Sequence, residues 1–175
     1  MGHKGLTTAE VSRRAGVTDA ARFYHFPTRD HLLVEALRAA DAETEDRLRP
    51  LARAGELDMT MVPTFVGISM DSPDPIGDLA TLMRGHAGDP AHPAHTYFLE
   101  HNKLAVTRLE EGLRKRLAGP RRDLGGETRS TARQLLAVWT GLCVQWKVDP
   151  SFDLEAEITQ AFARLTATSG LAARS

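Results

Sequence analysis

Apolar residues recur at helical spacing along most of the chain, and no segment shows the apolar–polar alternation of a half-buried strand. Capping residues, glycines and prolines punctuate these runs. One helical face follows Thr28 and is closed by Pro50 and Gly55. Others run from Ser72 up to Gly88 and from Asp89 up to Leu117, and two final helices are expected at about 127–148 and 153–168. Residues 56–72 predict a broken helix or loop, and the glycine-rich residues 118–126 predict a connection. The pattern therefore predicts an all-α fold.

The spacing also predicts which side chains of these helices face inward. The expected core positions are Leu32, Ala36, Leu37 and Ala40, then Ile76, Leu79, Ala80 and Met83, then Tyr97, Phe98, His101, Leu104, Ala105, Leu109, Leu113 and Leu117. In the last two helices they are Ala132, Leu135, Leu136, Trp139, Leu142, Cys143 and Trp146, then Leu154, Ile158, Ala161, Phe162 and Leu165.

Two short helices with a tight turn between them are predicted near the start of the chain. Thr7 and Glu10 have the spacing of a capping box, and the helix that they begin ends at Gly16. Thr18 can cap a second helix, which Pro27 ends. This is a helix-turn-helix pattern, in which the second helix has a polar start that suits the major groove of DNA.

Composition and charge are compatible with a small DNA-binding module at the start of the chain. The net charge of −1 over 175 residues excludes the strongly basic character of a protein that coats nucleic acid. Residues 1–35 carry five Lys/Arg against four Asp/Glu, a small positive excess. The single cysteine, Cys143, cannot form an internal disulfide, and neither a membrane-spanning run nor a signal peptide is seen. We therefore expect a cytoplasmic protein.

The residue identities in the helix-turn-helix segment point to a family more specifically than the helix pattern alone does. Residues 7–18 and 23–32, with Ala15-Gly16-Val17-Thr18 at the turn and Tyr24-His25-Phe26 before Pro27, closely resemble the signature of the TetR family of transcriptional regulators. The resemblance implies phosphate contacts at Thr7, Tyr24, His25 and Arg29, and base-edge contacts at Thr18, Ala20 and Ala21. Asp19 and Arg22 are expected to be exposed on the same helix and complete the expected DNA-binding set.

The sequence departs from the family pattern in three places. Phe23 stands where a phosphate-contacting Tyr is usual, and Arg22 stands where Leu is usual. The family has a further helix before these two, and this chain starts about where that helix would end. We expect the natural protein to be longer or its start to be misplaced; an impaired DNA-binding module is the remaining possibility.

The resemblance also implies the organisation of the rest of the chain. Residues 131–146 resemble the family's penultimate helix, so a DNA-binding domain at 1–40 is expected before a helical ligand-binding and dimerisation domain at 41–175. The expected homodimer interface comprises Leu135, Leu136, Trp139, Leu142, Trp146, Leu154, Ile158, Phe162 and Leu165. A small-molecule effector of unknown identity would meet Phe65, Met70, Leu82, Met83, His86, Tyr97, Phe98, His101, Trp139 and Cys143, although core packing explains each of these residues as well.

Three alternatives compete with a DNA-binding regulator released from operator DNA by its effector. His86, His92, His95 and His101 crowd a short stretch, but no Cys pair or carboxylate completes a ligand set at standard spacing, so no metal or other cofactor is expected. No phosphate-binding glycine loop or nucleophile motif indicates an enzyme. A helical dimer that senses a ligand but has lost DNA binding is the alternative that the missing first helix favours.

Overall fold

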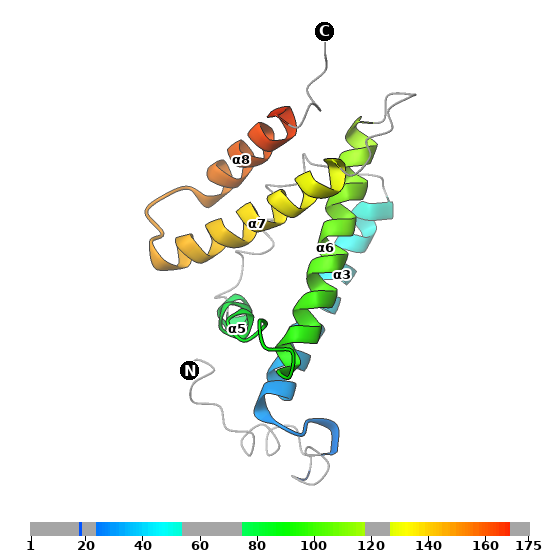
Figure 1. Cartoon of the computed structure of the whole chain (residues 1–175), viewed down its shortest axis with the longest axis vertical. Coiled ribbons are helices and arrows are strands. Elements are labelled where there is room, and N and C mark those ends of the chain that lie inside the picture. The colour runs from blue at the N-terminus through cyan, green and yellow to red at the C-terminus, as the bar shows by residue number, and fades with distance from the viewer. Residues whose placement is uncertain (1–17, 19–23, 54–74, 118–126, 169–175) are drawn as a thin grey trace. The chain divides into compact units, whose positions relative to one another are not determined.

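The computed structural model describes Thr18 and residues 24–53, 75–117 and 127–168, and every regular element in these ranges is helical. The all-α prediction is confirmed for this part of the chain. The helices are α3 (Arg29–Arg53), α5 (Pro75–Arg84), α6 (Pro93–Leu117), α7 (Glu127–Val148) and α8 (Leu154–Thr168) (Figure 1). None of these helices is both long enough and apolar enough to cross a membrane.

Helix starts follow the local signals in the sequence. The Thr28 hydroxyl oxygen accepts the backbone N–H of His31 at 3.3 Å, and Asp153 Oδ1 accepts that of Ala156 at 3.0 Å. Both are N-cap bonds, which satisfy amides that have no partner inside the helix. The helix expected from Asp89 begins only at Pro93, the first residue of α6. A proline is favourable at this position because the N–H that it lacks would have no partner inside the helix.

The α3 helix passes through Pro50 and ends at Arg53, between the two residues that were expected to close it, Pro50 and Gly55, because a proline so close to the helix end removes a backbone bond only from the last turns. One predicted helix end is wrong. The α5 helix ends at Arg84 and not at Gly88. Beyond Arg84 the chain tightens into successive turns, with the amides of Gly85, His86 and Ala87 each bonding three residues back.

The described helices belong to two compact units, which divide within α3 and within α6. The first unit contains α3 up to residue 48, α5, and α6 up to Glu100. The second contains the rest of α6 together with α7 and α8. Residue 40, the expected domain boundary, lies inside α3, so the two predicted domains share that helix.

The core of the first unit is built from three helices. Its buried residues are Leu33, Val34 and Leu37 of α3, Leu79 and Met83 of α5, and Ala94, Tyr97 and Phe98 of α6. Leu37, Leu79, Met83, Tyr97 and Phe98 were predicted there. Ala36 and Ile76 are exposed, so the inward stripe of each of their helices lies to one side of the predicted one.

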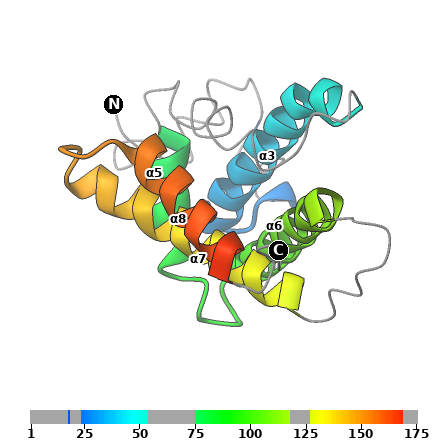
Figure 2. The ribbon, with the colours of Figure 1, turned by 90° about the horizontal axis from the view of Figure 1, so that it is seen from above.

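The core of the second unit joins α6 to the α7–α8 pair. It contains Val106 and Leu113 of α6, Ala132 and Leu135 of α7, and Leu154, Ile158 and Phe162 of α8. After the turn at residues 149–153, α8 folds back beside α7, as both views show (Figures 1 and 2). The predicted faces of α7 and α8 are confirmed, but Leu104 of α6 is 45% exposed and Val106 takes its place in the core.

Candidate functional site

The expected DNA-binding segment is described in part. Thr7, Asp19, Ala20, Ala21 and Arg22 lie outside the described residues. Thr18, Tyr24, His25 and Arg29 are described, and all four side chains are exposed. Exposure is what a phosphate contact requires, because phosphates are reached from the protein surface.

Local contacts position the exposed side chains of Tyr24, His25 and Arg29 near the start of α3. The Tyr24 ring is 84% exposed and meets the His25 ring edge to face, with 5.1 Å between ring centroids. Phe26 is half-buried with its ring tilted toward that of His25, and Thr28 then caps α3. Arg29 is the first residue of that helix. A phenol, an imidazole and a guanidinium are thus presented within six residues, and each can donate a hydrogen bond to a phosphate oxygen.

In the core of the first unit, one buried tyrosine is tied to a carboxylate. Tyr97 is only 3% exposed, and its hydroxyl donates to Asp41 Oδ2 at 2.9 Å. Burial raises the pKa of Tyr97 well above its usual value, and the charge of Asp41 and the hydrogen bond raise it further. Tyr97 is therefore neutral and a hydrogen-bond donor throughout the physiological range.

Two arginines flank the neighbouring aromatic rings of this core. The Arg84 guanidinium carbon lies 4.3 Å from the centroid of the Phe98 ring, and that of Arg38 lies 5.5 Å from the Tyr97 ring. Burial lowers the pKa of Arg84, although an arginine stays charged at any physiological pH. Arg38 also pairs with Glu100 at 2.9 Å and with Glu35 at 3.3 Å.

The predicted effector residues fall in both units. Phe65 and Met70 lie outside the described residues. In the first unit, Met83, Tyr97 and Phe98 meet in one core cluster, whereas Leu82 and His86 are exposed. In the second unit, His101, Trp139 and Cys143 are half-buried.

Sequence reasoning missed Asp41, Arg38 and Arg84, which surround the aromatic pair of the first unit. Asp41 and Tyr97 are 56 residues apart, so no local pattern connects them. The only signal for Arg84 was its position directly after Met83, an inward-facing residue at the end of a helix.

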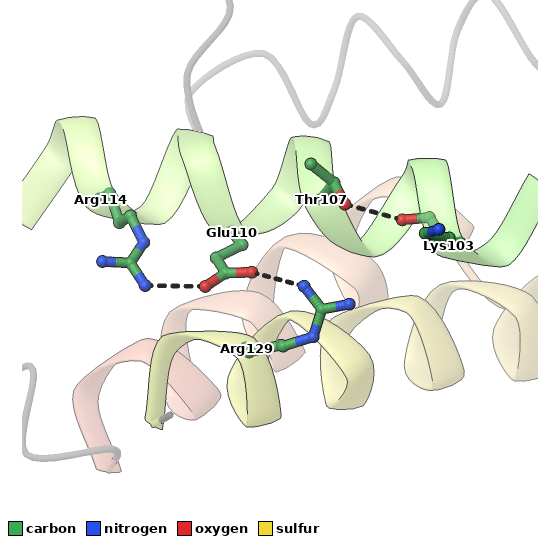
Figure 3. Close-up of polar contacts among 5 residues, drawn as sticks. All are labelled: Lys103, Thr107, Glu110, Arg114 and Arg129. Carbon is green, nitrogen blue, oxygen red and sulfur yellow. Dashed lines mark hydrogen bonds and ion pairs between the residues drawn. The ribbon is translucent and has the colours of Figure 1, made fainter. Parts of the chain in front are cut away.

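An ion-pair network ties α6 to α7 in the second unit (Figure 3). Glu110 of α6 has a side chain only 14% exposed. Its carboxylate accepts from Arg114 at 2.8 Å, one turn along the same helix, and from Arg129 of α7 at 3.0 Å. The hydrogen bond from Arg114, followed by that from Arg129, lowers the pKa of Glu110.

The predicted interface residues divide into two groups in the structure. Leu135, Leu154, Ile158 and Phe162 are buried in the chain's own core. Leu136, Trp139, Leu142, Trp146 and Leu165 are only half-buried against that core. The second group keeps apolar surface that a partner could cover.

The described residues contain no group of three or more His, Cys, Asp or Glu side chains placed to hold a metal ion. Comparison of the chain with models of protein families, with curated proteins and with solved structures found no match.

Proposed function

We propose that this chain is a ligand-responsive, DNA-binding transcriptional regulator of the TetR type, acting as a homodimer. The observation that carries the proposal is the helix-turn-helix signature of residues 7–32, whose described end presents Tyr24, His25 and Arg29 to solvent beside the capped start of α3. An all-helical body supports the same assignment.

Dimerisation is supported by the uneven burial of α7. Its first half is packed, with Thr128, Thr131, Ala132 and Leu135 buried. In its second half Trp139, Leu142 and Trp146 are half-buried, and Val144 and Val148 are exposed. A twofold partner on this surface would bury apolar area and would set two DNA-binding modules about one turn of DNA apart.

Effector response is supported by the aromatic core of the first unit. Met83, Tyr97 and Phe98 provide adaptable apolar surface, and Arg84 and Asp41 add charged groups, which is the usual mixture in small-molecule sites. In the proposed mechanism, the effector binds one packing of this unit better than another. The population shift would carry α3, and the DNA-binding segment before it, out of register with DNA.

DNA binding is tested with the full chain and duplexes from the region upstream of its own coding sequence. Fluorescence anisotropy at several salt concentrations gives the affinity and its salt slope. Arg29→Ala should weaken binding to every duplex and lower the slope by roughly one unit per lost phosphate contact. Lys115→Ala removes the same charge from the exposed surface of α6 and should leave both values unchanged.

Two results would decide against the proposal. One is that, at low salt, the chain binds every upstream duplex with the same affinity as a duplex of random sequence. The other is an equal loss in Arg29→Ala and Lys115→Ala, which would show only general attraction to a polyanion. A stable dimer that binds small molecules but no duplex would favour the ligand-sensing alternative.

A further inference from the structure

The second half of α7 has two apolar faces, and the chain's own core packs against only one of them. Trp139, Leu142 and Trp146 lie on the side that packs against the core of the second unit. Val144 and Val148 lie on the opposite side of the helix, where they are 37% and 84% exposed. The two valines therefore belong to an apolar face that the described part of the chain leaves largely open.

Two small residues continue this face toward the start of α7. Gly141 and Ala137 precede Val144 by three and seven residues, which is the spacing of one helical face. Ala137 is exposed, and a Cβ on Gly141 would meet no described atom within 4 Å. Glycine inside a helix is less favourable than alanine, and the packing described within the chain gives no reason for it here. A neighbour that approaches the α7 backbone closely would give one.

The side-chain sizes on this open face, Ala137, Gly141, Val144 and Val148, are complementary to a second copy of the same face. The two small residues are one helical turn apart, and so are the two valines. When two copies meet antiparallel, Val144 lies against the partner's Gly141, and Val148 lies against the partner's Ala137. A twofold axis makes both contacts reciprocal. A parallel arrangement would set glycine against glycine and leave a gap, whereas stable interfaces are packed as densely as protein interiors.

Charges at the two ends of the open face favour the same direction. Arg133 lies one turn before Ala137 and is exposed, and the exposed Asp149 directly follows Val148. Hydrogen bonds from the Ser151 side chain and backbone lower the pKa of Asp149, so its carboxylate is charged at neutral pH. Antiparallel copies bring the arginine of one toward the acidic end of the other. Parallel copies would bring like charges together, which opposes association.

We propose that this open face is the seam of the homodimer, with the two copies of α7 antiparallel, Val144 against the partner's Gly141 and Val148 against the partner's Ala137. The seam rests on the homodimer proposed above, and it specifies the face of α7 and the register in which the copies meet. It lies on the side of α7 opposite to Trp139, the side that the sequence-based expectation had placed at the partner.

A leucine at Gly141 tests the close approach. In a single chain the new side chain enters open space, so the helical circular dichroism should be kept. Across the seam it overfills the contact with the partner's Val144, and the dimer dissociation constant should rise about tenfold or more in sedimentation equilibrium. Gly112→Leu is the matched control, because a Cβ on this α6 glycine would also meet no described atom within 4 Å. It should leave the dissociation constant unchanged.

Disulfide cross-linking tests the register, in a Cys143→Ala background that removes the native thiol. Ala137→Cys and Val148→Cys are made in separate chains. At the antiparallel seam each position lies about 16 Å along the helix from its own copy in the partner, too far for a disulfide. Neither variant should therefore cross-link alone under mild oxidation. An equimolar mixture should give a covalent dimer that joins position 137 to position 148.

Three results would overturn the seam while leaving the homodimer standing. They are a Gly141→Leu chain that dimerises as tightly as the parent, a Val148→Cys chain that cross-links efficiently with itself, and dimers whose mixed cysteine variants do not cross-link. A parent chain that is monomeric at every concentration would instead refute the proposed homodimer, and the seam with it.

Discussion

At the Tyr97–Asp41 contact a buried hydroxyl donates a hydrogen bond to a carboxylate of the first unit. Tyr97→Phe keeps the ring and its packing but leaves Asp41 without this donor. Hydrogen bonds to charged groups are worth about 1.5–3 kcal/mol, so we expect the free energy of unfolding to fall by about 1–2 kcal/mol, because Asp41 has other interactions. Chemical denaturation measures the loss.

Tyr24→Phe is the matched control for that measurement, because it removes the same hydroxyl from an exposed ring. It should leave stability unchanged within about 0.5 kcal/mol. Equal losses in the two variants would contradict the role given to the buried hydrogen bond. Ultraviolet titration adds an independent check, since burial and Asp41 raise the pKa of Tyr97 and its ring should ionise well above the usual range of a phenol.

Glu110 supports the second unit through its charge, and the contribution should depend on pH. Arg114 and Arg129 hold its pKa below the ordinary value of 4.5, so folding favours the carboxylate. A lowered folded-state pKa gives stability that is complete well above pH 4.5 and is lost as pH falls through the folded-state pKa. Glu110→Gln should therefore lower the melting temperature at pH 7, and the difference from the parent should shrink in acid.

Thermal unfolding of Glu110→Gln at pH 7 and at more acidic values measures this trend. Glu111→Gln, at the exposed neighbouring position, is the control and should have little effect at any pH. A melting-temperature difference for Glu110→Gln that is the same in acid as at pH 7 would show that the side chain acts by its shape and not by its charge.

At the scale of the helix, the sequence predicted the features that depend on a few neighbouring residues, such as helix starts and helix ends. Thr28 and Asp153 begin α3 and α8 because a cap needs only a side-chain oxygen and an amide two or three residues later. The α7 and α8 bounds were predicted closely, since Asp149-Pro150 interrupts an otherwise regular apolar stripe. Such signals need no knowledge of the rest of the fold.

Errors arose where the answer depends on distant partners. The α6 helix gives Tyr97 and Phe98 to one core and Val106 and Leu113 to another, so no single stripe describes it. Leu104 fits an ideal period and yet is exposed. The same holds for the site: helical spacing placed Met83, Tyr97 and Phe98 in the core, but only the fold brings Asp41 to the Tyr97 hydroxyl.

The Asp153 cap offers a direct measure of how much such a local signal contributes. Asp153→Ala removes the acceptor of the Ala156 amide at the start of α8 and should lower the free energy of unfolding by about 1 kcal/mol. Asp153→Asn keeps an acceptor oxygen and should recover most of that loss. Denaturation of both variants tests this, and equal destabilisation by Ala and Asn would assign the effect to charge instead of capping.

Considered as a whole molecule, the chain leaves apolar surface on its last two helices. Leu135 and Ile158 are fully buried, whereas Leu142 and Trp146 are half-buried and Val148 is 84% exposed. Stable interfaces bury about 800 Å² per partner and concentrate aromatic side chains at their centre. The second half of α7 therefore supports the proposed homodimer more directly than the first half.

Sedimentation of the full chain should give twice the chain mass of 19.2 kDa at micromolar concentration. The double substitution Val144→Lys and Val148→Lys puts two charges one helical turn apart on exposed positions, so the fold of each chain should survive. Burial of these charges in an interface is costly, and the variant should be monomeric. Thr96→Lys, an exposed change on α6, should leave the dimer intact.

Loss of the dimer in the Val144/Val148 variant should weaken DNA binding. A monomer offers one recognition helix, with half of the phosphate contacts, so its salt slope should be about half that of the dimer. A variant that is monomeric yet binds duplex with the parent's affinity and slope would show that DNA binding does not need the twofold arrangement. A variant that stays dimeric would move the interface away from the end of α7.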